Sequence, residues 1–337
     1  MPVIKKTFTT TALKAVFGVT ALSCSLAVSN VSATTWMMAS GYADDNYMTV
    51  NLREMIDDIA KASDGKFQIS LHSNGTLVAL DGIRRAVQTG QVQMGEIRLG
   101  TFGNEDPMYI LDGIPFLANG YDRAWQLMTL QKDYFDKLAD RQGMKVIAYQ
   151  PWPAQGFYSR TPLETVEDFD GKTMRIYSKY TQQMGDMLGS RTVTLPFSEI
   201  PQAFATGMID TLFTSPQIGI DIQAWDNTKH YVVVGALNTK NAIVVNKKAF
   251  QKLSEAEQNV LLEAGERASK RGWQLSEQAF KDQLKVLESN GMEVSEASPE
   301  IIARLEEIGE TLTEQWRKEA KPEAVEVLDL YLQQQKQ

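Results

Sequence analysis

One arginine, on a short strand-like run, offers the clearest chemistry in this sequence. The run Thr173–Tyr177 alternates in character, so a strand here places Arg175 on the face opposite Met174 and Ile176. On that face the guanidinium is flanked by the hydroxyl and the phenol that end the run. A planar fork of N–H donors between two O–H groups fits the two oxygens of a carboxylate. From this strand alone, an ion pair with a structural acid is an equally good interpretation.

The amino-terminal end carries the pattern of a secretory signal peptide. Residues 1–33 hold three lysines and no acid, then the apolar stretch 15–28, then Val31–Ser32–Ala33, a small-residue cleavage pattern. We therefore expect export to a bacterial periplasm and a mature chain that begins near Thr34. An uncleaved membrane anchor is the alternative, but the apolar stretch is short for a bilayer and is interrupted by serine and threonine.

The cysteine content and the charge of the mature chain exclude several classes of function. Cys24, the one cysteine, lies in the predicted signal peptide, so the mature chain has no disulfide, thiolate nucleophile or cysteine-ligated metal. Whether Cys24 carries a lipid is left open. Removing the three lysines of residues 1–33 takes the formal net charge from -8 to -11, which disfavours nucleic acid and anionic membrane surfaces as partners. No later segment is apolar over the length of a transmembrane helix, so we expect no direct membrane insertion of the mature chain.

Helix and strand patterns alternate in the first part of the mature chain. Apolar residues recur at helical spacing over 48–59, and the strand-like run Phe67–Leu71 follows. The same order returns with a helix over 81–89 and a strand over 92–97. This alternation predicts an α/β fold in which helices cover a largely parallel sheet.

A similar short unit occurs twice. Ala86–Val92 resembles Ala203–Ile209, each being the end of a helix, a Thr–Gly stop and the entry to a strand. Glycine can take the left-handed backbone that ends a helix. Chance recurrence of a common idiom is the alternative to two similarly built lobes. If there are two lobes, the strand ends near 95–97 and 212–215 should approach one crevice, because α/β sheets bind ligands at the carboxyl ends of their strands.

The mature chain is longer than one hydrophobic core normally serves, which predicts two domains. The segment Gln150–Gly156, with two prolines and a glycine around a tryptophan, has the composition of a crossover or hinge. The strand-like run Asn241–Asn246 is expected to return to the first lobe, and the charged amphipathic helices beyond Ser254 are expected to brace both lobes. We predict a first lobe of residues 34–152 plus 241–280 and a second lobe of residues 153–240 plus 281–337.

Three motifs together resemble a known family. They are Glu167–Arg175, Pro196–Asp210 and Gly90–Gly95, and from Thr34 onward the chain is similar to solute-binding proteins of tripartite ATP-independent periplasmic (TRAP) transporters, the DctP-like family. The resemblance implies a two-lobed periplasmic-binding-protein fold, class II-like, with a ligand cleft between the lobes and long C-terminal helices. It also implies that the protein delivers a small organic acid to membrane subunits of an ion-driven transporter.

The resemblance assigns several residues to the ligand. Arg175 falls on the family's carboxylate-binding arginine, and Thr214 falls where many members place an asparagine. Ser178 occupies another position near the ligand. Gln155 lies where sialic-acid-binding members carry a second arginine, so Arg175 is expected to be the lone anchoring cation and one carboxylate is preferred over two. Members that bind an oxo acid through a metal have a carboxylate where Phe213 and Thr214 stand here, so we predict no metal and no cofactor.

Other candidates rest on their positions in the chain. Trp152 is a cleft wall or a hinge-packing residue, Asn241 reaches the hinge or caps a strand, and Phe213 is expected to face the cleft. Glu96 accepts hydrogen bonds from a ligand or pairs with Arg98, and pairing is preferred because an acid repels a carboxylate. The predicted ligand-binding set is Arg175, Thr214, Gln155, Trp152, Phe213, Ser178, Tyr177, Glu96, Tyr42 and Asn241.

Two other classes of function remain. An enzyme with a Ser-His-Asp triad or a histidine-rich metal site would have to use one or both of the two histidines, His72 and His230, and each has the pattern of a strand-edge residue. No phosphate-binding loop or dinucleotide fingerprint is present, so we predict that the protein is not an enzyme. A binding component of an ATP-driven importer or a sensor would share the two-lobed fold, and the family signature alone argues against it.

Overall fold

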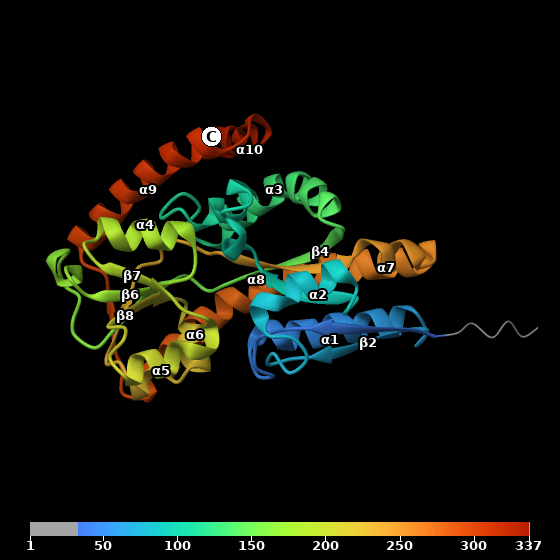
Figure 1. The fold of residues 1–337 in the computed structure, drawn as a ribbon, viewed down its shortest axis with the longest axis horizontal. Helices are drawn as coiled ribbons and strands as arrows, with labels where there is room; N and C mark the ends of the chain where they lie inside the picture. The colour runs from blue at the N-terminus through green and yellow to red at the C-terminus, as the bar shows by residue number, and fades with distance from the viewer. Residues whose placement is uncertain (1–32, 337) are drawn as a thin grey trace, which may run out of the picture. The chain divides into compact units, whose positions relative to one another are not determined.

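Residues 33–336 are described by a computed structural model, and they form a mixed α/β structure with two sheets (Figure 1). The predicted signal peptide lies outside the described residues except for Ala33. Among the residues described, no helix combines the length and the apolarity that crossing a membrane requires. The α/β class predicted from the alternating patterns is confirmed.

The first sheet has five strands in the order β2-β1-β3-β10-β4. Four helices lie in the chain between or directly after these strands: α1, α2, α3 and α7. Of these, α1 and α2 match the helical patterns found in the sequence. The bounds are β1 Thr34–Ala39, α1 Tyr47–Ala62, β2 Phe67–His72, α2 Ile83–Thr89, β3 Met94–Arg98, α3 Tyr121–Arg141, β4 Met144–Pro151, β10 Lys240–Asn246 and α7 Lys247–Lys252. Short 3-10 turns lie at η1 Leu80–Gly82, η2 Leu99–Phe102 and η3 Pro107–Gly113.

The second sheet has six strands in the order β11-β9-β5-β8-β6-β7. Its bounds and those of its helices are β5 Gly156–Ser159, β6 Thr173–Ile176, α4 Lys179–Met187, β7 Arg191–Thr194, α5 Ile200–Ala205, β8 Thr211–Thr214, α6 Pro216–Asp221, β9 His230–Val233 and β11 Glu293–Glu296. The 3-10 turns are η4 Glu167–Phe169, η5 Phe197–Glu199 and η6 Ala224–Asp226. The edge strand β11 was not predicted, because its sequence is polar and its side chains are mostly exposed.

Each sheet contains one strand that runs against the others. β10 is antiparallel to both β3 and β4, and β5 is antiparallel to both β8 and β9. The cause is the crossing between the sheets: β4 ends at the connection 152–155 and β5 begins directly after it, while β9 and β10 are joined in the same way through 234–239. A strand that starts at the crossing must run back from it. The expected return of residues 241–246 to the first sheet is confirmed.

The repeated helix–Thr–Gly–strand unit has the same backbone structure in both sheets. Gly90 and Gly207 are both left-handed, with φ of 77° and 74°. Thr89 and Thr206 each donate their hydroxyl to the carbonyl four residues earlier, at 2.9 Å in both cases. These glycines satisfy the helix end and turn the chain into β3 and β8. The prediction of a recurring local unit is therefore confirmed, and it puts equivalent strand ends at equivalent places in the two sheets.

The long helix α8 (Glu255–Ser289) contacts elements of both sheets. It packs on α1 and β4, and farther along on α6 and β11. Its contact with β4 is close: a Cβ on Gly265 would lie 2.3 Å from the carbonyl oxygen of Ile147. Ser269, one turn further on, accepts the backbone N–H of Tyr149 at 3.0 Å. Small residues therefore let this helix lie directly on the β4 backbone.

The two C-terminal helices, α9 (Pro299–Glu319) and α10 (Pro322–Gln334), brace the structure as predicted (Figure 1). Arg304 on α9 donates to the carbonyl of Met187 at the end of α4 (2.8 Å). The indole of Trp316 donates to Pro107 O at 2.7 Å, and Tyr331 on α10 donates to Leu117 O at 2.9 Å. These bonds tie α4 of the second sheet to the segment 107–117 that precedes α3.

We expect Gly265→Ala to lower the free energy of unfolding by roughly 1–3 kcal/mol, because the added methyl group overpacks the contact with β4. Chemical denaturation of the mature protein measures the change. Gly113→Ala is the matched control, since a Cβ there meets no atom within 4 Å. Equal effects of the two substitutions would contradict the close contact.

Candidate ligand-binding site

The ends of the two equivalent strands, β3 and β8, meet at one small cavity. Arg98 ends β3, Thr214 ends β8, and both line the cavity, as the sequence predicted for the ends of these strands. Its volume is about 30 Å³. The full lining is Tyr42, Arg98, Trp152, Gln155, Arg175, Tyr177, Phe197, Thr214, Ser215, Ile218 and Thr239.

Arg175 lies at this cavity on the predicted strand. Met174 and Ile176 are in the hydrophobic core, and the arginine projects from the other face of β6 with 2% of its surface exposed. Its Nη2 donates to Leu195 O at 3.2 Å, and its Nε has no partner. Within residues 33–336 it forms no ion pair with an acid, so the alternative of a structural ion pair finds no support there.

The electrostatic environment of Arg175 disfavours its charge. Burial is the main cause and the nearby Arg98 guanidinium is the second, and together they lower the pKa of Arg175 to about 9. The guanidinium therefore stays protonated at neutral pH in a setting that does not neutralise it. A buried cation without a counter-ion is costly, and an anion placed between these groups would relieve that cost.

Arg98 is a second cation that lines the same cavity. The expectation that Arg175 is the lone anchoring cation did not take this residue into account, and it stays a prediction. Arg98 forms an ion pair with Asp81 of η1, with Nη2 3.3 Å from Oδ1. Its Nε is buried and has no partner. Arg98 ends β3 of the first sheet, 57 positions before Gln155, so the residue type at position 155 carries no information about this second cation.

Glu96 does not line this cavity, and its expected pairing with Arg98 is wrong, since Arg98 pairs with Asp81. It is fully buried behind the cavity, where burial raises the pKa of its carboxyl group. Its carboxylate accepts hydrogen bonds from Ser40 (2.7 Å), Asn241 (3.0 Å) and Gln150 (3.4 Å).

Asn241 connects this buried acid to the aromatic wall. Its Nδ2 donates to Glu96 at 3.0 Å and to the phenol oxygen of Tyr42 at 3.3 Å, while its Oδ1 accepts the indole N–H of Trp152 at 2.9 Å. The Tyr42 and Trp152 rings meet edge to face with centroids 5.0 Å apart. Glu96 and Asn241 therefore do not line the cavity themselves but hold two side chains that do.

The connections between the sheets supply polar groups to the cavity. Gln155 donates from Nε2 to the hydroxyl of Thr239 (2.9 Å) and accepts the phenol O–H of Tyr177 at Oε1 (2.8 Å). Burial raises the pKa of Tyr177 to about 12, which keeps the phenol protonated. Thr239 was not predicted from the sequence, because nothing in the connection 234–239 distinguishes it before the fold brings it against Gln155.

Two predicted residues face elsewhere. Phe213 packs in the core against Phe157, with ring centroids 4.7 Å apart. Since Thr214 faces the cavity, strand alternation turns Phe213 to the opposite side of β8, a signal that was present in the sequence. Ser178 caps helix α4, where its Oγ accepts the N–H of Thr181 at 3.2 Å, and it is absent from the cavity lining. Phe197, Ser215 and Ile218 line the cavity and were not predicted.

One hydrogen bond crosses between the two sheets' helices beside the cavity. Asn46 caps α1 by accepting the N–H of Met48 at 2.9 Å, and its Nδ2 donates to Oδ2 of Asp221, at the end of α6, also at 2.9 Å. Burial raises the pKa of Asp221 to about 6. The same amide therefore both caps a helix of the first sheet and holds an acid of the second.

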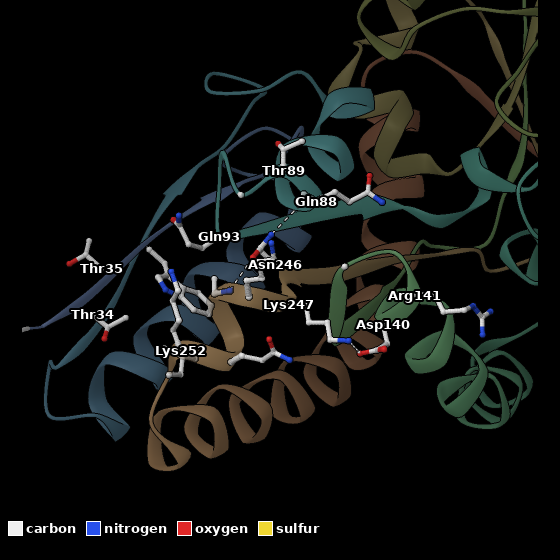
Figure 2. A pocket seen from close by; sticks show the side chains of 17 residues that line it. Thr34, Thr35, Gln88, Thr89, Gln93, Asp140, Arg141, Asn246, Lys247 and Lys252 are labelled. Atoms are coloured by element: carbon white, nitrogen blue, oxygen red, sulfur yellow. Dashed lines mark hydrogen bonds and ion pairs between the residues drawn. The ribbon is translucent and has the colours of Figure 1, made fainter.

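A larger hollow, of about 820 Å³, lies at the far end of the first sheet, where β1 begins and β10 ends (Figure 2). Two of its central polar side chains are already paired. Asn246 donates to Val87 O at 2.8 Å. Lys247 forms an ion pair with Asp140, which Figure 2 marks with a dashed line. No unpartnered buried polar atom of the described chain belongs to this lining. The small cavity with its two arginines is the stronger candidate site.

Two α/β sheets joined by two short connections and by the long helix α8, with a cationic cavity at the strand ends between them, define a two-lobed solute-binding protein. The model of the family "bacterial extracellular solute-binding protein, family 7" (DctP) matches residues 38–319, and the chain belongs to this family, whose members are solute-binding proteins of TRAP transporters. The resemblance stated from the sequence is confirmed.

Solved structures agree with this assignment. The chain is similar to DctP7 of Bordetella pertussis, described as an extracytoplasmic solute receptor binding pyroglutamic acid, with 36% identity, a TM-score of 0.86, and coverage of 89% of this chain and 99% of that one. DctP6 of the same organism, described in the same way, gives 37% identity, the same TM-score, and coverage of 89% and 100%.

A more distant relative in sequence is the C4-dicarboxylate-binding periplasmic protein DctP of Rhodobacter capsulatus. It is 25% identical over 249 residues, which are 72% of this chain and 74% of the relative.

We expect Asn46→Ser to speed the release of a bound acid about 2- to 10-fold. The serine hydroxyl still caps α1, but the hydrogen bond that the Asn46 side-chain amide donates to Asp221 is lost. Stopped-flow tryptophan fluorescence measures the rate, since Trp152 lines the cavity. Asn46→Ala should release as fast and in addition unfold at lower denaturant concentration. An unchanged release rate in Asn46→Ser would show that this bond does not hold the lobes together.

Proposed function

We propose that this protein captures pyroglutamic acid, or a closely related small monocarboxylate, in the periplasm and presents it to the membrane subunits of a TRAP transporter. The observation that carries the proposal is the burial of the Arg175 guanidinium at the cavity where the strand ends meet, without an acid partner in the described chain. Support for the ligand comes from two receptors, 36% and 37% identical over nearly their whole length, that are described as binding pyroglutamic acid.

The chemistry of the cavity suits a five-membered lactam that carries one carboxylate. Arg175 would bind the carboxylate with its fork of N–H donors. The hydroxyls of Thr214 and Thr239 would form hydrogen bonds with the lactam N–H and C=O, since a hydroxyl can both donate and accept. The rings of Tyr42, Trp152 and Phe197 line the cavity and would cover the apolar ring atoms.

We assign a carrier role and no catalysis. The described lining of the cavity contains no histidine, cysteine, aspartate or glutamate, so its serine and threonine hydroxyls have no ordinary general base among the lining residues to activate them. The two histidines lie elsewhere, at the end of β2 and at the start of β9, where His230 lies beside Glu293. Among residues 33–336 no group of three or more histidine, cysteine or acidic side chains is arranged to hold a metal ion.

The two lobes would part to admit the ligand. A volume of about 30 Å³ is room for one or two water molecules, and a lactam acid is larger. With lobes of residues 34–152 plus 241–280 and 153–240 plus 281–337, the connections 152–155 and 234–239 and the helix α8 would form the hinge. Closure of such lobes on a ligand is a common switching motion in binding proteins.

A thermal-shift panel tests the ligand class. We expect L-pyroglutamate to raise the melting temperature, because a ligand that binds only the folded state stabilises it, by about 2.7 kcal/mol at one hundred times its dissociation constant. 2-Pyrrolidinone, which keeps the lactam and lacks the carboxylate, is the matched control and should give no shift. A larger shift with succinate or malate than with any monocarboxylate would contradict the proposal.

Arg175→Ala should weaken acid binding by about one hundred-fold or more, because it removes a charge-assisted bidentate contact worth about 3 kcal/mol. Isothermal titration calorimetry with L-pyroglutamate measures the loss. Arg191→Ala removes the same charge from an exposed position on the adjacent strand β7 and should bind like the wild type. Undiminished affinity in Arg175→Ala would refute the assignment.

A further inference from the structure

Arg98 and Arg175 come from different sheets and approach the same aromatic ring. Arg98 ends β3 in the first sheet, and Arg175 lies on β6 in the second. The central guanidinium carbons lie 5.9 and 5.8 Å from the ring centroid of Tyr177. Cations at this distance from a phenol ring are attracted to it, so one tyrosine holds both arginines near the cavity.

The two arginines, together with Tyr177, line both the small inner cavity and a neighbouring outer pocket. The inner cavity has a volume of about 30 Å³ and the outer pocket one of about 370 Å³. Thr101 and Thr194 add hydroxyls to the outer pocket, and Asp81 is the one acid in its described lining.

The charges of these lining residues do not balance. Two guanidinium groups face one carboxylate, that of Asp81, which is 58% exposed and therefore a weak counter-ion. Each arginine keeps a buried Nε with no hydrogen-bond partner, although buried N–H donors are normally satisfied. The residues that line the two pockets therefore carry an excess of one positive charge and two unused donors.

We propose that Arg98 is a second carboxylate-binding residue, so that one ligand carboxylate bridges Arg98 of the first sheet and Arg175 of the second while Arg98 loosens its ion pair with Asp81. This inference rests on the proposed function. The bridging carboxylate converts the repulsion between the arginines into an attraction of each for the same anion. Because the arginines lie on different sheets, that attraction favours the closed arrangement of the lobes.

The same charge count sets the preference for one carboxylate over two. With Arg98, Arg175 and Asp81 in place, a monoanion brings the net charge of the group to zero. A dianion would leave one uncompensated negative charge in a largely buried site, which is unfavourable. Asp81 is then a specificity-determining residue, although it does not have to touch the ligand.

Calorimetry on the mature protein with L-pyroglutamate and with succinate tests these roles. We expect Arg98→Gln to weaken L-pyroglutamate binding about 10- to 100-fold, a loss in the range of charged hydrogen bonds. Arg98→Lys, which keeps the charge without the planar fork, should lose less. Asp81→Asn should bind L-pyroglutamate at least as tightly as the wild type and should bind succinate several-fold more tightly.

Arg84→Gln is the matched control. Arg84 has the same 16% side-chain exposure as Arg98 and also pairs with one acid, Glu105, but it lines neither pocket. It should bind L-pyroglutamate within two-fold of the wild type. Melting temperatures of all variants without ligand show that each is folded, and Asp81→Asn tests the charge count even if Arg98→Gln does not fold.

The outcomes separate this inference from the function on which it rests. If the wild type binds L-pyroglutamate and Arg175→Ala does not, but Arg98→Gln binds within two-fold of the wild type, then Arg98 is no carboxylate-binding residue. An unchanged preference between succinate and L-pyroglutamate in Asp81→Asn would overturn the role of Asp81. If the wild type binds neither acid, the proposed function fails and this inference fails with it.

Discussion

A buried positive charge that the described chain does not neutralise is the constraint around which this structure is arranged. Arg175 is almost fully enclosed, has no acid partner among residues 33–336, and has its pKa lowered by burial and by Arg98. Such a group lowers the stability of the empty protein. Under the proposed function, the carboxylate of a bound ligand would neutralise this charge, and the stability lost in the empty protein would add to the free energy of binding.

The topology of the two sheets explains why Arg175 lies close to a second cation, Arg98. In each sheet most strands run in one direction and a single strand runs back, because the chain crosses from one sheet to the other after β4 and returns after β9. The carboxyl ends of β3 and β8 are thereby brought to the same cavity. Glu96 and Asn241 lie buried behind the cavity. Asn241 is hydrogen-bonded to Glu96 and in turn to Trp152 and Tyr42, so these bonds hold the aromatic wall of the cavity in place without a ligand.

Local patterns predicted the elements well. The helical spacing over 48–59, the alternation over 67–71 and the two Thr–Gly stops correspond to α1, β2 and the ends of α2 and α5, because each depends on neighbours a few residues away. The strand β11 was missed, since it is polar and is held by pairing with a distant strand. Phe213 was assigned to the wrong face, although alternation with Thr214 was sufficient to place it in the core.

The sequence by itself determined the class of the protein, the strand that carries Arg175 and the side of that strand on which the guanidinium lies. These follow from short-range periodicity and from motifs that lie within single segments. Only the tertiary structure decided the partners of those residues: Arg98 pairs with Asp81 and not with Glu96, and it joins Arg175 beside Tyr177. The physical reason is that pairing in a folded chain depends on through-space distance, and the crossings between the sheets bring together side chains that the sequence keeps far apart.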